Sequence, residues 1–177
     1  LSAIKGLERD SGKRMTQIIL DELPDTSKDQ LCVLSGPNLS QEVVEGQPAS
    51  TVVAGFNPAT AKWVQELYSS STFRVYSNDD VIGVELGGAL KNAIAIGAGI
   101  CDGLGYGANQ KAAFVTRGLA EITRLSVACG AKPLTMFGLA GFGDMIATCF
   151  STEPVSEPVQ IAVCGVLLDL QVSKSSA

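Results

Sequence analysis

The segment covering residues 81–100 limits the fold more than any other part of the chain. It consists of Gly, Ala, Val, Ile and Leu, apart from Glu85, Lys91 and Asn92. A helix that is apolar on all sides is typical of one surrounded by other elements, and its small residues allow backbones to pack closely. We therefore expect a buried helix over roughly residues 80–100.

A membrane-spanning helix is the alternative for this segment, and Gly83 and Gly87 have the spacing of a helix-packing motif. A charge near the middle of a spanning helix costs about 3 kcal/mol, however, and this segment contains both Glu85 and Lys91. We therefore predict a buried helix of a soluble protein and no membrane span.

Lys91 is the leading catalytic candidate. Burial disfavours the charged ammonium, so a lysine in this segment must be paired, be neutral or face a polar cavity. A lowered pKa would let the amine donate or accept a proton near neutral pH, as general acid–base catalysis requires.

Two parts of the chain have different hydrophobic periods. Short apolar runs in residues 31–77 alternate with turn residues and one amphipathic stretch, the pattern of strands joined by a crossover helix. From residue 78 onwards, long segments rich in small residues predict helices. The fold class is therefore α/β followed by all-α. Expected strands cover 31–34, 50–54 and 73–76, and expected helices cover 12–23, 57–70, 80–100, 109–129 and a last segment from Asp144.

Charge and residue usage exclude several classes of function. The net charge is −5 and the basic residues are scattered, so there is no basic stripe for a nucleic acid, whereas small acids remain candidate ligands. The chain has no histidine, and none of its five cysteines has the close partner of a zinc or redox motif. We expect reduced thiols, no metal site and no hydrolytic triad.

The chain starts without an initiator methionine and without the basic-then-apolar layout of a signal peptide. We expect it to be an interior fragment of a longer, cytoplasmic protein.

Two motifs in the α/β part have the residue types of a binding site. Lys5 follows a short apolar stub and could lie at the end of a strand, where anions bind in an open parallel sheet, although an exposed loop lysine is more common. Ser35-Gly36-Pro37-Asn38 follows an expected strand. Backbone N–H groups and Asn38 could receive hydroxyl or phosphate oxygens there, although an ordinary turn explains the same residues.

Residues 138–144 form a glycine-rich run that precedes the last expected helix. If that helix begins at Asp144, Asp144 and Thr148 lie one turn apart on the same face. A carboxylate there could hold or orient a buried lysine. An aspartate N-cap, worth about 1 kcal/mol, explains Asp144 equally well.

Residues 103–108 match the dinucleotide fingerprint G-x-G-x-x-G/A in form. That fingerprint requires a strand before it, whereas this run follows an expected helix. We interpret it as a break between two helices.

Five motifs occur together in one order. They are Lys5-Gly6-Leu7-Glu8, Ser35-Gly36-Pro37, Gly83-Val84-Glu85-Leu86-Gly87-Gly88-Ala89-Leu90-Lys91-Asn92, Gly99-Ile100-Cys101-Asp102-Gly103 and Gly138-Leu139-Ala140-Gly141-Phe142-Gly143-Asp144. In order and spacing they resemble NAD(P)-dependent glycerol-3-phosphate dehydrogenase, over about residues 1–151.

The resemblance implies a fold and an activity. Residues 1–78 would end a Rossmann-type NAD(P)-binding domain, and residues 79–151 would begin a helical substrate domain like that of 6-phosphogluconate dehydrogenase. The implied reaction interconverts sn-glycerol 3-phosphate and dihydroxyacetone phosphate with NAD or NADP, a step of glycerol-3-phosphate and phospholipid precursor metabolism. A homodimer is implied for the full-length protein.

The resemblance also implies roles for individual residues. Lys91 matches the lysine that exchanges a proton with the carbinol oxygen, and Lys5 matches a second lysine at the substrate and the nicotinamide. Ser40 falls on a cofactor-contacting position where the family usually has Ala. The remaining implied substrate-binding residues are Gly36, Asn38, Asn92, Asp144 and Thr148.

The chain also departs from the family. The Rossmann half that bears G-x-G-x-x-G is absent, and with it the residue that would distinguish NADH from NADPH. Since the cofactor pyrophosphate would have no binding site here, we expect the chain to be inactive on its own. Residues 152–177 follow neither hydrophobic pattern and stay unassigned. At their start, Thr152-Glu153-Pro154 stands where the family has a run whose arginine binds the substrate phosphate. A non-catalytic remnant or interaction module that retains the helical core is therefore the main alternative, and a dehydrogenase of another small phosphorylated or carboxylated substrate is the second.

Overall fold

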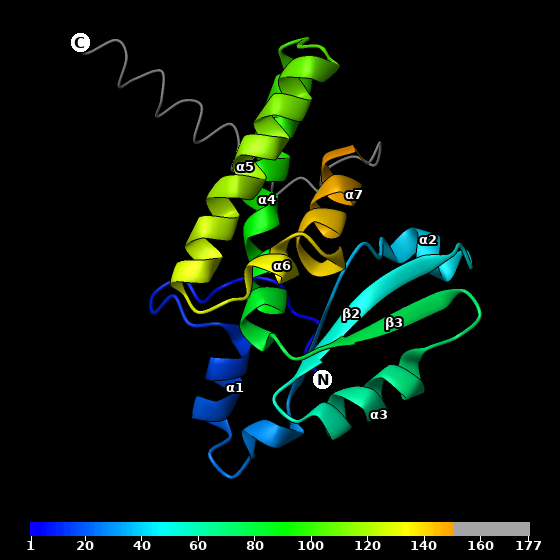
Figure 1. Ribbon diagram of the computed structural model, residues 1–177, viewed down its shortest axis with the longest axis vertical. Helices are drawn as coiled ribbons and strands as arrows, with labels where there is room; N and C mark the ends of the chain where they lie inside the picture. The colour runs from blue at the N-terminus through cyan, green and yellow to red at the C-terminus, as the bar shows by residue number, and fades with distance from the viewer. Residues whose placement is uncertain (151–177) are drawn as a thin grey trace.

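A computed structural model describes residues 1–150 of the chain (Figure 1). The expectations for residues 152–177 lie outside the described residues. The first half contains α1 (Met15–Glu22), the 3-10 helix η1 (Lys28–Gln30), β1 (Cys32–Ser35), α2 (Ser40–Val44), β2 (Ala49–Gly55), α3 (Pro58–Tyr68) and β3 (Phe73–Asn78). The second half contains α4 (Val81–Gly103), α5 (Ala108–Ala128), α6 (Pro133–Met136), the π-turn η2 (Leu139–Gly143) and α7 (Asp144–Phe150). The prediction of an α/β half followed by an all-α half is confirmed.

The three strands form one sheet in the order β1-β2-β3. β2 and β3 are parallel and joined by α3, which confirms the predicted crossover, and Val53 pairs with Ser77 in their register. β1 instead pairs antiparallel with β2, with Val33 opposite Ala54. The physical reason lies in α2, which buries none of its residues and therefore does not cover a sheet face as a crossover helix would.

The sheet is the middle layer of the α/β half. Neighbouring residues of a strand point to opposite faces, and the two sides of β2 therefore enter two different cores. One core joins the sheet to α3 and contains Cys32, Val53, Ala61, Val64 and Val75. The other contains Val33, Val52, Ala54, Val81, Val84 and Ala140, and it attaches the start of α4 and the turn η2 to the opposite face.

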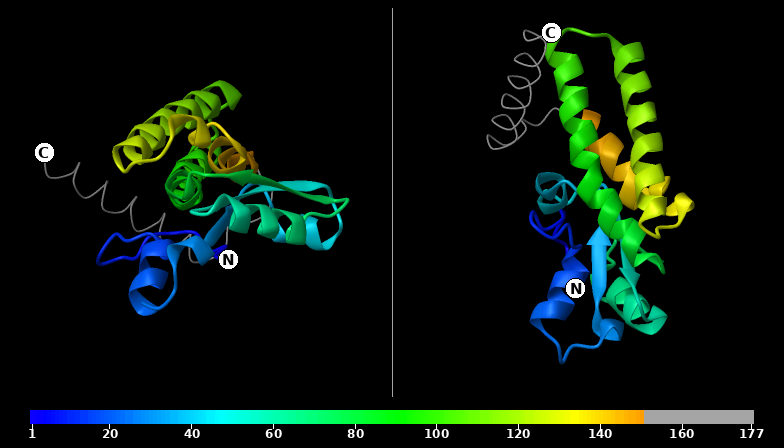
Figure 2. Two further views of the ribbon diagram at one scale, coloured as in Figure 1. Left: turned by 60° about the horizontal axis from the view of Figure 1, so that its bottom comes forward. Right: turned by 90° about the vertical axis from the view of Figure 1, so that its left-hand side faces the viewer.

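The two long helices α4 and α5 lie side by side and α7 packs against α4 (Figure 2). Their core contains Ala98, Val115, Leu119, Ile122, Met136, Met145 and Cys149. The break predicted at residues 103–108 is confirmed, with Gly105 at φ +73° between the two helices. Close packing through small residues is also observed, because a Cβ at Gly118 would lie 2.6 Å from Ile94 Cδ1.

The helix expected over residues 80–100 is confirmed as α4, but its burial changes along its length. Val81 and residues 83–88 are buried, whereas Asn92 and Gly99 are exposed within the described residues. Enclosure on all sides therefore applies to the first half of α4 only.

Within residues 1–150, two helical stretches, Val81–Gly103 and Pro133–Phe150, are long and apolar enough to cross a membrane by length and composition alone. Half of the apolar window of the first stretch is buried inside the protein, and Glu85 and Lys91 have ion-pair partners there. These features are typical of a core helix, and the absence of a membrane span stays a prediction.

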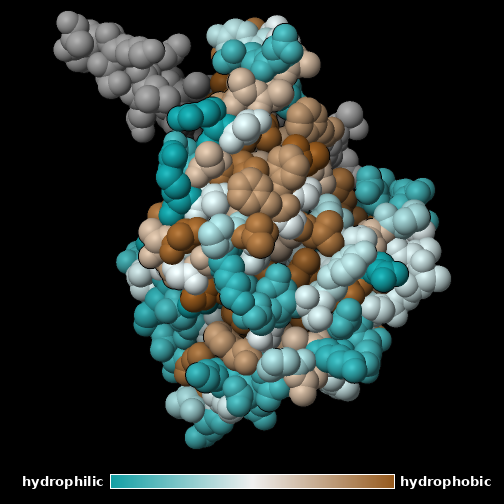
Figure 3. Space-filling view, in the orientation of Figure 1, coloured by the Kyte–Doolittle hydropathy of each residue, from teal (hydrophilic) through white to brown (hydrophobic). Residues whose placement is uncertain are grey.

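Apolar side chains also reach the surface of the helical half. Figure 3 shows them gathered over the middle of that half, between hydrophilic ends. The large exposed apolar residues of this half include Leu134, Phe137, Phe142 and Phe150. Part of this half is therefore not covered by any described segment.

The contact between α4 and η2 yields a stability prediction. A Cβ at Gly87 would lie 2.6 Å from the Ala140 carbonyl oxygen and 3.2 Å from the Gly141 Cα, which are backbone atoms that cannot rotate away. We expect Gly87→Ala to lower the free energy of unfolding by about 1–3 kcal/mol in urea titrations.

Gly99→Ala in the same helix is the matched control. A Cβ at Gly99 would meet nothing within 4 Å, so alanine there should raise the free energy of unfolding by about 0.5–1 kcal/mol. Equal effects of the two substitutions would contradict the close backbone approach at Gly87.

Candidate active site

Asp144 begins α7 with its side chain buried at the junction of the two halves. The turn before it folds around glycine, because a Cβ at Gly141 would overlap the Met136 backbone. Together with the contact between Gly87 and the Ala140 carbonyl, this turn brings the Asp144 carboxylate within reach of α4.

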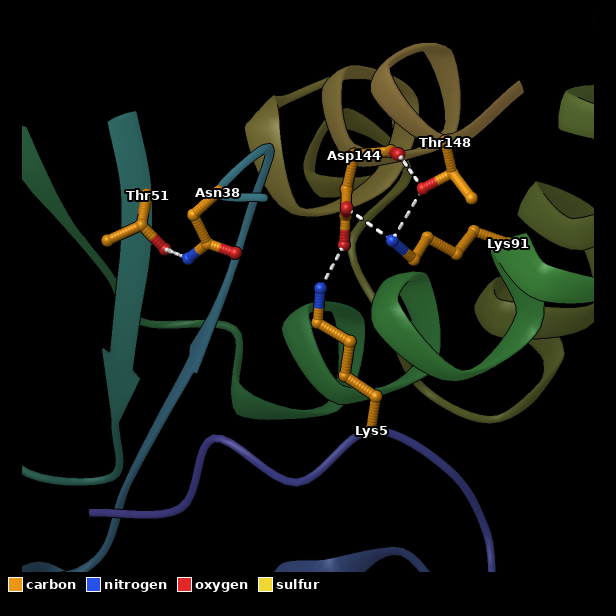
Figure 4. Close-up of polar contacts among 6 residues, drawn as sticks. All are labelled: Lys5, Asn38, Thr51, Lys91, Asp144 and Thr148. Atoms are coloured by element: carbon orange, nitrogen blue, oxygen red, sulfur yellow. Dashed lines mark hydrogen bonds and ion pairs between the residues drawn. The ribbon is translucent and has the colours of Figure 1, made fainter. Parts of the chain in front are cut away.

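Lys91 projects from α4 onto this carboxylate (Figure 4). Its ammonium donates to Asp144 Oδ1, and it also donates to Thr148 Oγ1 at 2.8 Å. The Thr148 hydroxyl in turn donates to the Asp144 carbonyl oxygen at 2.7 Å. The one-turn spacing predicted for Asp144 and Thr148 is thus observed, and both side chains meet the buried lysine.

Lys5 approaches the same carboxylate from the N-terminal segment. Its Nζ lies 2.6 Å from Asp144 Oδ2, and its side chain is 27% exposed. The aliphatic stem passes α4 at Gly88, where a Cβ would lie 3.4 Å from Lys5 Cγ. Lys5 is therefore not a free surface lysine, because it forms half of a pair of cations on one carboxylate.

This arrangement also decides between the two explanations of Asp144. Its carboxylate oxygens accept from two lysines, and within residues 1–150 no backbone N–H donates to them as it would to an N-cap. Asp144 therefore serves to hold the lysines rather than to cap α7.

The three charges leave one net positive charge at a largely buried site. Burial lowers the pKa of Lys91, and this effect outweighs the opposing attraction of Asp144, while the nearby Lys5 cation lowers the pKa further. Lys91 therefore loses its proton more readily than an ordinary lysine does, and the net positive charge around it favours the binding of an anion. These are the properties expected of a proton donor to a negatively charged substrate.

The loop after β1 forms a second wall of the site. Gly36 packs against β2 so closely that a Cβ there would lie 2.8 Å from the Thr51 Cα. Asn38 Nδ2 donates to Thr51 Oγ1 at 3.1 Å, and Figure 4 shows the amide oxygen turned to the side of the lysines. The structure therefore brings Gly36 and Asn38 to the same side of the molecule as the charged cluster.

Two of the predicted site residues, Asn92 and Ser40, are exposed. Asn92 follows Lys91 but is exposed, since one residue along a helix turns the side chain by about 100°. Ser40 is exposed at the start of α2. Within residues 1–150, neither side chain makes a hydrogen bond, and their roles stay predictions.

The structure adds residues that the sequence analysis did not place at the site. Thr51 orients Asn38, and the buried Ser35 hydroxyl lacks a partner among the described residues and lies beside Gly88. Ser35 belongs to the candidate binding motif Ser35-Gly36-Pro37-Asn38, in which the sequence analysis gave a role to the backbone and to Asn38, and its position directly before Gly36 was the available signal. No signal in the sequence pointed to Thr51, because it occupies an ordinary strand position.

Comparison with known proteins assigns this two-part fold to a class of oxidoreductases. Residues 1–61 match the sequence model of the NAD-dependent glycerol-3-phosphate dehydrogenase N-terminus, and residues 80–154 match that of its C-terminus. The chain therefore belongs to the NAD-dependent glycerol-3-phosphate dehydrogenase family.

Individual relatives agree with this assignment. The chain is 56% identical over 150 residues to the glycerol-3-phosphate dehydrogenase [NAD(P)+] of Dehalococcoides mccartyi strain 195, covering 85% of this chain and 42% of that protein. It is 54% identical over 149 residues to the enzyme of the same name from Lysinibacillus sphaericus, covering 84% and 44% of the two chains. The chain thus spans less than half the length of these curated relatives.

Solved structures show the same fold. The crystal structure of glycerol-3-phosphate dehydrogenase from Coxiella burnetii superimposes with a TM-score of 0.81 at 35% identity, over 98% of this chain and 57% of that one. A structure from Dunaliella salina gives a TM-score of 0.80 at 29% identity, over 92% and 27% of the two chains.

The charge cluster yields a prediction on proton binding. We expect Lys91 to deprotonate at lower pH than an ordinary exposed lysine, because burial disfavours its ammonium form and lowers its pKa. Asp144→Asn should lower the pKa of Lys91 further by removing an attractive charge, and Lys5→Met should raise it by removing a repulsive one. NMR titration of isotopically dimethylated lysines would measure all three values.

The lowered pKa of Lys91 also determines how the free energy of unfolding depends on pH. Between the lowered pKa of Lys91 and the ordinary value, the unfolded chain binds more protons, so this residue's contribution to stability rises with pH across that window. A pKa of Lys91 that falls in Lys5→Met would contradict this account of the cluster.

Proposed function

We propose that the chain contributes the proton-transfer centre of a dehydrogenase that interconverts sn-glycerol 3-phosphate and dihydroxyacetone phosphate with NAD or NADP. The observation that carries the proposal is the pair of lysines on the buried Asp144 carboxylate, with the pKa of Lys91 lowered by burial. Membership of the family supports the choice of substrate and cofactor.

Lys91 supplies the proton in this proposal. In the direction of reduction, a hydride adds to the carbonyl carbon, the π electrons move to the oxygen, and the Lys91 ammonium gives that oxygen its proton. In the direction of oxidation, the neutral amine takes the hydroxyl proton as the hydride leaves. Thr148 and Asp144 hold the Lys91 nitrogen in place in both protonation states.

Lys5 and Asp144 control the charge around this transfer. Lys5 stabilises negative charge that develops on the substrate oxygen, and Asp144 keeps the two cations close together despite their repulsion. Gly36, Asn38 and Asn92 complete the substrate side of the site.

The residues of this chain fit the reactive end of a nicotinamide cofactor. Because Gly88 has no Cβ, the Ser35 hydroxyl and the Lys5 stem pack closely against α4, and this buried hydroxyl has hydrogen-bonding capacity that no described residue uses. Lys5 and Ser40 are the cofactor-contacting residues in this proposal. When bound, the cofactor supplies or accepts the hydride.

The remaining assignments follow from the family. We assign residues 1–78 to the end of the cofactor-binding domain and residues 79–151 to the start of the substrate domain. The full-length protein would be a cytoplasmic homodimer in glycerol-3-phosphate metabolism.

A turnover experiment tests the proposal. We expect a full-length version of the protein, which includes the G-x-G-x-x-G half, to oxidise NADH or NADPH in the presence of dihydroxyacetone phosphate but not of unphosphorylated dihydroxyacetone. Lys91→Met should lower kcat by about 10²- to 10⁴-fold, because the proton donor is lost. Lys62→Met, an exposed lysine of α3, is the matched control and should retain turnover.

Two outcomes would overturn this function. Unchanged turnover in Lys91→Met would exclude Lys91 as the proton donor. A folded full-length protein with neither turnover nor binding of dihydroxyacetone phosphate in calorimetry would favour a non-catalytic remnant or interaction module. Turnover with another small acid would favour the second alternative.

A further inference from the structure

Glu85 is a buried carboxylate of α4 that the chemistry proposed above does not use. Its side chain is 5% exposed. Oε1 accepts from the Thr16 backbone N–H at 2.8 Å, Oε2 accepts from the Thr16 hydroxyl at 2.8 Å, and the Arg14 guanidinium also donates to Oε2. All these donors come from the N-terminal segment, so Glu85 connects that segment to α4.

Arg14 lies close to Lys5 through local backbone structure. Residues 7–14 fold back on themselves, with Leu7 and Arg14 paired in an antiparallel bridge and the Glu8 N–H donating to the Lys13 carbonyl at 3.0 Å. Lys5 is two residues before Leu7. A contact that fixes Arg14 therefore also limits where the Lys5 backbone lies.

Apolar packing contributes little to the position of this segment. Among the described residues, the three hydrophobic clusters contain no residue before Cys32. Thr16 is the only buried residue of α1, and its partner is Glu85. Ser2 holds the segment to β1 through two backbone hydrogen bonds before Lys5, and within residues 1–150 Glu85 accepts the hydrogen bonds that attach it to α4 after Lys5.

One face of α4 links this attachment to the site. Glu85, Gly88 and Lys91 follow one another at three-residue spacing, which places neighbouring members about one turn apart. Glu85 holds the N-terminal segment, Gly88 contacts the Lys5 stem, and Lys91 contacts Asp144. Lys5 thus reaches Asp144 alongside the helix that also presents Lys91.

We propose that Glu85 is a positioning residue, which holds the Lys5 ammonium on Asp144 through its contacts with Arg14 and Thr16. The inference deepens the proposed function and rests on it for its catalytic meaning. The geometry itself can be tested without turnover, because Lys5 is an amine whose reactivity depends on that contact.

The test measures the rate at which a small acetylating reagent, the N-hydroxysuccinimide ester of acetic acid, modifies each lysine of the 177-residue protein. Peptide mass spectrometry gives the rate at Lys5 relative to Lys62. We expect Glu85→Ala to raise the relative rate at Lys5 about tenfold, the factor for losing one charge-assisted hydrogen bond. Glu85→Gln should give a smaller increase, since its amide oxygen can still accept from Thr16.

Asp80→Asn is the matched control for a purely structural role. Asp80 is also a buried carboxylate at α4, but it accepts from the Gly83 and Lys132 N–H groups, away from the N-terminal segment. This variant should lose stability and leave the relative rate at Lys5 unchanged. Should Glu85→Ala fail to fold by circular dichroism, Glu85→Gln carries the test.

A double variant separates this inference from the proposed function. Asp144→Asn should itself raise the rate at Lys5, and adding Glu85→Ala should give no further increase. An unchanged rate at Lys5 in both folded Glu85 variants, together with an increase in Asp144→Asn, would overturn the role of Glu85 alone. An unchanged acetylation rate at Lys5 in Asp144→Asn would contradict the contact between Lys5 and Asp144, on which both proposals depend.

Discussion

The buried carboxylate of Asp144 is the interaction on which the site depends. It contacts Lys91 from α4 and Lys5 from the N-terminal segment, which are far apart in the chain. Two ammonium groups this close would repel each other strongly without a shared counter-ion, and burial would add a desolvation cost. One carboxylate for two cations reduces the repulsion but leaves a positive charge. The site is thus held together while it retains an affinity for anions.

The glycines of α4 and η2 explain how this carboxylate reaches its position. Gly87 and Gly141 allow backbone to touch backbone, so α7 starts next to α4 without intervening side chains. A longer separation would leave Asp144 beyond the reach of Lys91, whose Nζ it contacts directly. The abundance of small residues in residues 81–100 therefore serves the chemistry as well as the packing.

The sequence predicted the two-part fold and the long helices, because helical periodicity and burial are local properties. It placed Asp144 and Thr148 on one helix face, but it left a contact between Asp144 and a buried lysine and an N-cap role for Asp144 as equal explanations. It did not predict the antiparallel pairing of β1 with β2, which depends on α2 staying off the sheet. Lys5 was reached through family resemblance, since its own neighbours fit an exposed loop. The contact of Glu85 with Arg14 joins residues far apart in sequence, and no periodic pattern encodes it.

The antiparallel pairing of β1 and β2 has a consequence for how such a site diversifies. Ser35 at the end of β1 is paired with Val52 in the middle of β2, so the ladder holds the connection between them at both of its ends. Residues 39–48 of that connection are largely exposed and bury nothing in α2. Insertions or deletions there would reshape the rim beside Asn38 while the register and the lysines stay in place. Changes in the length and sequence of this connection could therefore alter substrate specificity during evolution while the fold stays stable.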